Sequence, residues 1–313
     1  MRNVTVRQLQ MFVQAAEAGS FTRAAEKLRV SPAAVSFQIK QVEDGTGFAL
    51  FERIGKKVTP TEAGRALLLH ARVVLQALHD ADQALMALRG VVGGHAKVGA
   101  VSTAKYIVPH IMARFQKLYP GVAIDLRFGN RRQIASSLAR GEIELAVMGR
   151  PPEEADVNAH PFASHPSLLV ASPTHPLAGA PALVPQDLAG VALLAREEGS
   201  GTRLLMEQLC ADAGITARIA LTTDSNETIK QAAMAGMGIA LLSQHTVGLE
   251  LALRLLKTLP MEGFPVMRSW FVVHRRAMPL MPAHARLNAF FAEHGQAIID
   301  ELECSYQRAG VMG

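Results

Sequence analysis

Apolar residues recur at helical spacing in three short segments near the start of the chain. In the first segment, Leu9, Phe12, Val13 and Ala16 fall at positions i, i+3, i+4 and i+7, which places them on one face of a helix. Two further segments repeat this spacing, with apolar positions at Phe21, Ala24, Ala25, Leu28, Val35, Ile39 and Val42. The pattern therefore predicts three short amphipathic helices in succession.

Capping residues mark where these helices begin and end. Gly19 follows the first helix, where glycine favours the left-handed conformation that ends a helix, and Ser20 is placed to cap the second. Ser31 followed by Pro32 gives the third helix a strong start, because proline lacks the N–H that this position leaves unbonded. Two compact helices with a tight connection, the second strongly capped, are typical of a helix-turn-helix.

The third helix carries the residues that we expect to contact DNA. Its outward face near the N-terminus has small, hydroxyl, aromatic and basic side chains, which can approach base edges in the major groove. The predicted contacts on this helix are Ser31, Pro32, Ala33, Ser36, Phe37 and Lys40.

Two short apolar pieces around a basic turn follow over residues 48–59, and we interpret them as a β-hairpin wing. Arg53, Lys56 and Lys57 in this wing are predicted to hold DNA phosphates, which contribute affinity without sequence information. A small helical bundle with a solvated basic loop is the alternative interpretation.

A long helix is predicted after the wing. Thr59-Pro60-Thr61-Glu62 has the form of a capping box with proline at the first helical position, and glycines at 90, 93 and 94 end the helix near Arg89. Apolar residues step alternately by four and three along it, which predicts a coiled-coil dimer interface. The predicted interface residues are Leu67, Ala71, Val74, Leu78, Ala81, Leu85 and Leu88. The alternative is a single helix that lies on a neighbouring domain.

Strands and helices alternate from Lys97 onward, which predicts α/β layers with largely parallel sheets. Besides two helices over residues 106–118 and 134–140, a last helix is predicted over about residues 283–303. The predicted strands cover residues 98–101, 122–128, 144–148, 168–171, 191–194, 219–222, 238–242 and 269–273.

Polar segments follow several of these strands, where α/β folds bind ligands. The loop over 199–203 opens a helix, and a helix N-terminus favours an anion. The predicted effector-binding residues are Ser102, Thr103, Lys105, Arg150, Gly199, Ser200, Gly201, Thr202, Arg203 and Asn226. The alternatives are an ordinary turn for this loop, a helix cap at Asn226 and a hinge at Arg150.

Charge and composition narrow the class of protein. The chain has 313 residues, enough for two or three domains, and a net charge of +5. Residues 1–65 hold ten Lys and Arg against six Asp and Glu, so most of that charge lies beside the predicted helix-turn-helix and favours a polyanion partner. With no apolar run of about 20 residues and no secretory signal, we expect a cytoplasmic protein without membrane contact.

Catalysis and metal binding are not expected from the residues present. The two cysteines, Cys210 and Cys304, are too far apart in sequence for a zinc motif and are expected to be free thiols. We find no paired nucleophile and base, no metal-ligand spacing and no cofactor fingerprint, so the chain is predicted to be neither an enzyme nor a metalloprotein.

Five motifs of the first 65 residues together resemble the winged helix-turn-helix of LysR-type transcription regulators. They are Leu9-Gln-Met-Phe, Gly19-Ser-Phe-Thr-Arg-Ala-Ala-Glu-Lys-Leu, Ser31-Pro-Ala-Ala-Val-Ser, Leu50-Phe-Glu-Arg and Thr59-Pro-Thr-Glu-Ala-Gly64. The resemblance implies dimerisation through the long helix and a two-lobed α/β effector domain, like a periplasmic binding protein, with the ligand between its lobes. The implied domains are 1–58 for DNA binding, 59–90 for the linker helix, 95–167 plus 268–303 for lobe I, and 168–267 for lobe II.

Segments of the C-terminal region resemble the CbbR group of this family, which activates Calvin-cycle carbon-fixation genes. They are Met148-Gly-Arg-Pro-Pro152, Gly199-Ser-Gly-Thr-Arg203 and the segments over 225–238 and 241–251. This resemblance implies a small anionic effector, such as a phosphorylated sugar or NADPH, and no resident cofactor. The implied partners are double-stranded promoter DNA, further copies of the chain in a dimer or tetramer, and RNA polymerase.

Two alternative functions remain at this point. The chain can be a LysR-type regulator of another pathway, such as sulfur assimilation. It can also be a solute-binding protein or an enzyme on the same two-lobed fold, although the basic helix-turn-helix argues against a solute receptor.

Overall fold

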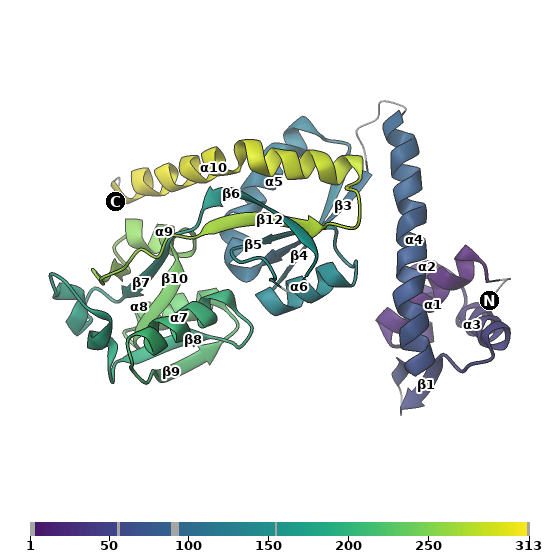
Figure 1. The fold of residues 1–313 in the computed structure, drawn as a ribbon, viewed down its shortest axis with the longest axis horizontal. Helices are drawn as coiled ribbons and strands as arrows, with labels where there is room; N and C mark the ends of the chain where they lie inside the picture. Colours follow the sequence, from purple (N-terminus) through teal and green to yellow (C-terminus); the bar gives the residue numbers. More distant parts are fainter. Residues whose placement is uncertain (1–3, 55–56, 89–93, 154, 312–313) are drawn as a thin grey trace. The chain divides into compact units, whose positions relative to one another are not determined.

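The computed structural model describes residues 4–54, 57–88, 94–153 and 155–311, and the chain divides into two compact units, Met1–Arg89 and Gly90–Gly313 (Figure 1). The N-terminal unit contains three short helices, a hairpin and one long helix. These elements are α1 (Val6–Ala18), α2 (Phe21–Leu28), α3 (Pro32–Thr46), β1 (Phe51–Ile54), β2 (Lys57–Pro60) and α4 (Glu62–Leu88).

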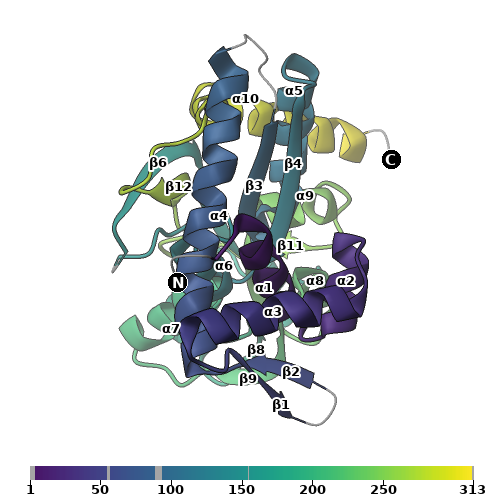
Figure 2. The same ribbon diagram turned by 90° about the vertical axis from the view of Figure 1, so that its right-hand side faces the viewer.

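The predicted ends of the first three helices are confirmed. Gly19 ends α1 with φ of 59°, and the Ser20 hydroxyl accepts a hydrogen bond from the Arg23 backbone N–H at 3.4 Å at the start of α2. The Ser31 hydroxyl accepts the backbone N–H of Ala34 at 3.2 Å, with Pro32 as the first residue of α3. Figure 2 shows α3 above the hairpin of β1 and β2.

The predicted capping box of the long helix is wrong. Thr59 and Pro60 belong to β2, where they pair with Glu52 and Phe51 of β1. Thr61 caps α4 instead, and its hydroxyl accepts the Gly64 backbone N–H at 3.0 Å. The hairpin occupies the backbone up to residue 60, so the helix begins two residues later than the local pattern predicts.

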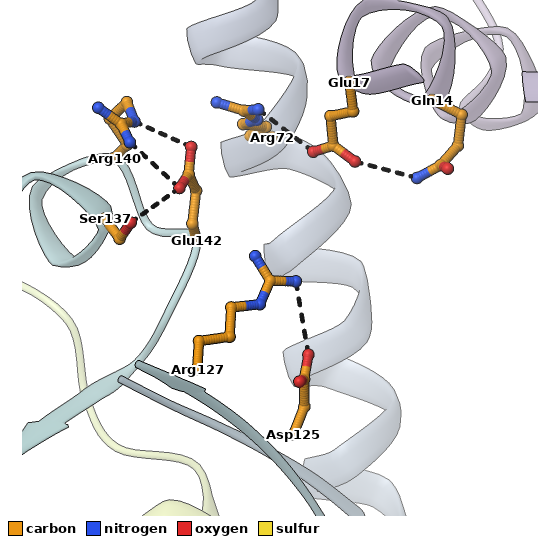
Figure 3. A network of polar contacts seen from close by, with 8 residues as sticks. All are labelled: Gln14, Glu17, Arg72, Asp125, Arg127, Ser137, Arg140 and Glu142. Atoms are coloured by element: carbon orange, nitrogen blue, oxygen red, sulfur yellow. Dashed lines mark hydrogen bonds and ion pairs between the residues drawn. The ribbon is translucent and has the colours of Figure 1, made fainter. Parts of the chain in front are cut away.

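The start of α4 packs inside its own unit. Leu67 and Ala71 are buried in one cluster with Leu9, Phe12 and Leu50. This corrects the predicted dimer stripe, because the structure leaves these two side chains no surface for a partner. An ion pair adds to the packing of α4 on α1: Arg72 lies 3.2 Å from the Glu17 carboxylate, which also accepts a hydrogen bond from Gln14 (Figure 3).

The described part of the second unit contains two five-stranded sheets, one in each lobe (Figure 1). The strand order is β4-β3-β5-β12-β6 in lobe I and β11-β7-β10-β8-β9 in lobe II. Lobe I contains β3 (Gly94–Val101), η1 (Ser102–Tyr106), α5 (Val108–Leu118), β4 (Val122–Gly129), α6 (Arg131–Ala139), β5 (Leu145–Met148), β6 (Val157–Ser164) and β12 (Ser269–Arg275). Lobe II contains β7 (Ser167–Ala171), η2 (Pro176–Gly179), η3 (Pro185–Leu188), β8 (Ala192–Arg196), α7 (Gly201–Asp212), β9 (Arg218–Thr223), α8 (Asn226–Met234), β10 (Ile239–Ser243), α9 (Gln244–Ala252) and β11 (Lys257–Thr258).

The prediction of largely parallel sheets is wrong. In lobe I, β3 pairs in parallel with β4 and β5, but β12 pairs antiparallel with β5 and β6. Lobe II is mixed in the same way, since β10 is parallel to β8 and antiparallel to β7. Each antiparallel pair includes a strand next to one of the two crossings between the lobes, namely β6, β7 or β12, and the alternation of strands and helices along the chain does not predict the direction of those strands.

The two crossing segments pair with each other. Ser167 and Val266 exchange two backbone hydrogen bonds of 3.0 Å, and the His165 N–H donates to the Arg268 carbonyl at 2.7 Å. The lobe boundaries predicted from the sequence lie beside these residues, but β6, β11 and α9 were not predicted. The last helix, α10 (Pro282–Val311), also extends beyond the predicted end at residue 303.

Helix α10 packs on β6 and α5 of lobe I and reaches α9 of lobe II (Figure 1). Its side chains Leu287, Phe290 and Phe291 are buried in the core of lobe I, where Trp270 is fully buried. The helix therefore contacts both lobes. Among the described residues, no helix is both long and apolar enough to cross a membrane.

Candidate functional site

Helix α3 presents the predicted DNA contacts on one exposed face. Val35, Ile39 and Val42 are buried, which turns the opposite face outward. The Phe37 ring is 59% exposed on this face, so it is open to a partner. The exposed residues on this face are Ser31, Pro32, Ala33, Ser36, Phe37 and Lys40. Their contact with DNA remains a prediction.

The predicted wing forms as an antiparallel hairpin. Ile54 pairs with Lys57, and the Lys57 side chain is exposed. Lys56 and the side chain of Arg53 lie outside the described residues. The carboxylate of Glu43 on α3 accepts the backbone N–H of Leu50 at 2.7 Å, which ties the wing to the end of the helix.

A pocket lies between the two lobes of the second unit. Lobe I contributes the ends of β3 and β5 and the start of α6, lobe II contributes the end of β8 and the start of α7, and both crossing segments add a residue. The lining residues are Val101, Ser102, Thr103, Asn130, Arg131, Met148, Gly149, Arg150, His165, Arg196, Ser200, Gly201, Thr202 and Arg268. Four arginines and several residues with hydroxyl groups thus line one small space.

Two helices start at this pocket. Asn130 caps α6 by accepting the Gln133 N–H at 3.0 Å, and Ser200 caps α7 by accepting the Thr202 N–H at 3.3 Å. The positive ends of both helix dipoles therefore lie beside the arginines. This combination favours an anion with oxygen acceptors.

Six of the predicted effector residues line the pocket, and four do not. Lys105 lies against the Phe128 ring, 5.5 Å from its centroid, and Arg203 forms an ion pair with Glu207 at 2.6 Å. Gly199 has φ of 84° and supports the turn before α7 without lining the space. Asn226 is the fourth: its side-chain oxygen accepts a hydrogen bond from Arg196. The residues correctly placed in the lining are Ser102, Thr103, Arg150, Ser200, Gly201 and Thr202.

Arg196 lines the pocket but is not among the residues predicted from the sequence. Its side chain is 2% exposed and is held by Glu197, with Nε 2.9 Å and Nη2 3.1 Å from the two carboxylate oxygens. Asn226 at the start of α8 completes this network. A charged residue at the end of an apolar strand was the signal available in the sequence.

Arg131, His165 and Arg268 were also missed. The Arg131 guanidinium donates hydrogen bonds of 3.1 Å to the carbonyls of Arg150 and Pro151. Arg268 donates to the Ser167 hydroxyl at 2.8 Å, and burial together with nearby Arg150 lowers its pKa to about 10. Arg268 is therefore still protonated at neutral pH.

The pocket is small in this structure. The space open to the centre of a water molecule is about 30 Å³. A buried water needs roughly 10–15 Å³ on the same measure, so only one or two small groups fit without movement of the lining. Among the described residues no cluster of three or more His, Cys, Asp and Glu could hold a metal, and Cys210 and Cys304 are free.

Two protein families match the chain. Residues 6–65 match the bacterial regulatory helix-turn-helix protein, lysR family, and residues 89–296 match the LysR substrate binding domain. The chain belongs to the LysR family. The predicted winged helix-turn-helix and two-lobed effector domain are those of this family, whose role is transcription regulation. The family resemblance and fold class given by the sequence are thereby confirmed.

Relatives within the LysR family share most of their length with this chain. It is 45% identical over 294 residues to the HTH-type transcriptional regulator CfxR of Cupriavidus necator. This match covers 94% of this chain and 93% of the relative. It is 44% identical over 285 residues to CbbR of Rhodospirillum rubrum, and this match covers 91% of this chain and 95% of the relative. The predicted resemblance to CbbR is confirmed.

A solved structure resembles the LysR effector domain of this chain. The regulatory domain of CcmR from Synechocystis PCC6803, in complex with 2-PG, is 34% identical with a TM-score of 0.62. The match covers 64% of this chain and 97% of the CcmR domain.

Proposed function

We propose that this LysR-family member regulates carbon-fixation genes and that a small anion bound between its lobes controls it. The observation that carries the proposal is one small pocket at two helix N-termini that is lined by Arg131, Arg150, Arg196 and Arg268. Two of these arginines also form ion pairs within the protein, Arg150 with Glu153 and Arg196 with Glu197. Charge-assisted hydrogen bonds from such a set select phosphate or carboxylate oxygens. The 2-PG bound to the CcmR domain supports an anion of this kind.

The size of the pocket favours a ligand of few atoms. The open space of about 30 Å³ supports a small anion over a dinucleotide such as NADPH. A small anion needs only modest movement of the lining side chains. Binding would then shift the balance between lobe arrangements through its different affinity for each.

The gene target follows from the relatives. The CfxR, CbbR and RuBisCO operon regulators that resemble this chain each match more than nine-tenths of it, both the DNA-binding part and the effector domain. We therefore propose carbon-fixation promoters as the DNA partner, with sulfur-assimilation promoters as the competing target. Action in the cytoplasm and contact with RNA polymerase belong to the same proposal.

Self-association through α4 is the remaining part of the proposal. Beyond the core residues Leu67 and Ala71, the same stripe carries Val74, Leu78 and Leu85, which are 44%, 44% and 60% exposed. Ala81 is exposed too, and the side chain of Leu88 lies outside the described residues. An exposed apolar stripe of this length favours a second helix as its partner, in a homodimer or a tetramer.

Two measurements on the full chain test the proposal. Calorimetry should show that 2-PG binds, while NADPH binds at least about tenfold more weakly and sulfate does not compete. Recovery of bound promoters from the source cell should yield carbon-fixation genes. Binding of sulfate with recovery of sulfur-assimilation promoters would overturn the proposed target, and tight NADPH binding would overturn the ligand class.

A further inference from the structure

His165 is a buried histidine whose ring contacts are unusual. It lies on the first crossing segment, lines the pocket and is 2% exposed. Neither ring nitrogen has a hydrogen-bond partner among the described residues. Buried polar groups in folded proteins are nearly always hydrogen-bonded, so a ring in this position is suited to a bound ligand.

Two neighbours fix the ring of His165. On one side it stacks on the indole of Trp270, with 3.8 Å between centroids and 15° between planes. At its edge lies Gly149, where a Cβ atom would stand 2.6 Å from Nδ1 of the imidazole. Only a glycine at 149 lets the ring lie there, and Gly149 itself lines the pocket.

The charge state of His165 follows from these surroundings. Burial, and then the positive charge of Arg268 and the neighbouring His245, hold its pKa well below the ordinary value. The imidazole is therefore neutral at physiological pH, with one N–H donor and one acceptor nitrogen. A neutral donor beside a guanidinium suits an oxyanion that carries several acceptor oxygens.

We propose that His165 donates a hydrogen bond to the anion in the pocket and that Trp270 transmits the occupancy of the pocket to α9 and α10. The first half rests on the anion-binding function proposed above. The second half rests on contacts that continue from Trp270 away from the pocket.

These contacts run from one lobe to the other. The Trp270 indole N–H donates to Nδ1 of His245 on α9 at 3.1 Å, so in the neutral ring Nε2 carries the proton. That nitrogen lies 3.3 Å from a carboxylate oxygen of Glu303 on α10, which also accepts a hydrogen bond from Gln244 at 3.0 Å. A shift of the His165 ring thus acts on the indole, and the indole acts on both helices.

The chain has its own probe of this contact. Trp270 is the single tryptophan in the sequence, so the intrinsic fluorescence of the full chain reports the indole that stacks on His165. Titration with 2-PG should change this fluorescence with the affinity that calorimetry gives. Inorganic phosphate serves as a second, smaller probe.

His165→Phe is the central variant, because it keeps an aromatic ring on Trp270 and removes the donor. We expect its affinity for 2-PG to fall about 10- to 100-fold, as for a lost hydrogen bond to a charged group. Gly149→Ala is the second variant, because its added Cβ atom displaces the imidazole of His165 without removing it. We expect its affinity for 2-PG to fall as well. Arg203→Ala, whose guanidinium is paired with Glu207 outside the pocket, is the matched control and should bind like the unaltered chain.

His245→Phe tests the transmission. It should retain affinity for 2-PG within about twofold while the ligand-dependent change in hydrogen exchange near Glu303 disappears. If the unaltered chain binds 2-PG and both His165→Phe and Gly149→Ala bind it equally well, the role of His165 is overturned. The anion-binding function stands in that case. An unaltered chain that binds neither 2-PG nor phosphate would overturn both.

Discussion

The indole N–H of Trp270 donates a hydrogen bond to Nδ1 of His245 at 3.1 Å, and both side chains are buried. The bond joins β12 of lobe I to α9 of lobe II. It requires an unprotonated Nδ1, and burial lowers the pKa of His245 to about 4. The contact between the lobes therefore depends on a neutral imidazole.

This relationship predicts a loss of stability in mild acid. The unfolded chain binds a proton at His245 near pH 6.5 and the folded chain only near pH 4, so the free energy of unfolding falls as pH decreases through that window. The loss is on the order of 3 kcal/mol from this residue. Burial lowers the pKa of His165 as well, so this residue also lowers the free energy of unfolding as the pH decreases.

Urea unfolding followed by Trp270 fluorescence at pH 7 and pH 4.5 measures most of this loss, because pH 4.5 lies about two units below 6.5. His245→Gln keeps an acceptor for the indole and cannot be protonated, so its stability should depend less on pH than that of the unaltered chain. Equal pH dependence of the two proteins would show that His245 is not the group responsible.

Thr202 and Arg203 are neighbours, but only Thr202 is expected to contribute to ligand binding. Thr202 is buried in the pocket lining, whereas Arg203 is paired with Glu207 one turn along α7. Thr202→Val should weaken the binding of 2-PG about tenfold, because it replaces the hydroxyl donor by a methyl group of similar shape. Arg203→Ala should leave the affinity within about twofold, and calorimetry compares the two directly. A larger loss in Arg203→Ala than in Thr202→Val would move the ligand out of this pocket.

Phe37 and Lys57 should separate sequence-specific from general DNA binding. Phe37→Ala removes an exposed ring from the predicted base-contacting face of α3 and should cost roughly 1–3 kcal/mol of specific binding, with nonspecific binding nearly intact. Lys57→Ala should weaken both alike and flatten the salt dependence by about one unit. Gel-shift titrations against operator and random DNA at several salt concentrations give both results. Equal loss of the two affinities in Phe37→Ala would contradict its role.

Leu78 tests the self-association of α4. Leu78→Asp places a charge in the predicted helix–helix interface, which costs several kcal/mol unless the charge finds a partner. Sedimentation of this variant should show smaller species than the unaltered chain. Leu69→Asp is the control, since Leu69 is also exposed on α4 but lies outside the predicted stripe. Unchanged assembly of Leu78→Asp would place the interface elsewhere.

Local chemistry made much of the N-terminal unit predictable. A helix cap acts within three residues, so Gly19, Ser20 and Ser31 marked the helix ends correctly from sequence alone. The apolar period likewise separated buried Val35, Ile39 and Val42 from the exposed face of α3. The motifs that resemble LysR-type regulators then gave the family and its two-lobed fold.

The same local rules failed where distant pairing decided the structure. Thr59 has the form of a helix cap, but its pairing with Glu52 across the hairpin assigns it to a strand. Leu67 and Ala71 fit a coiled-coil stripe, yet contacts with α1 bury them in their own unit. Arg203 was placed in the effector site although its partner Glu207, four residues on, was visible in the sequence.

The sequence by itself determined the family, the helix-turn-helix and six residues of the pocket, because each of these depends on spacing within one element or on motifs along the chain. The tertiary structure alone decided that Arg131, Arg196, His165 and Arg268 meet around one space. The last two come together because the crossing segments pair antiparallel, more than a hundred residues apart, and no local pattern encodes that pairing.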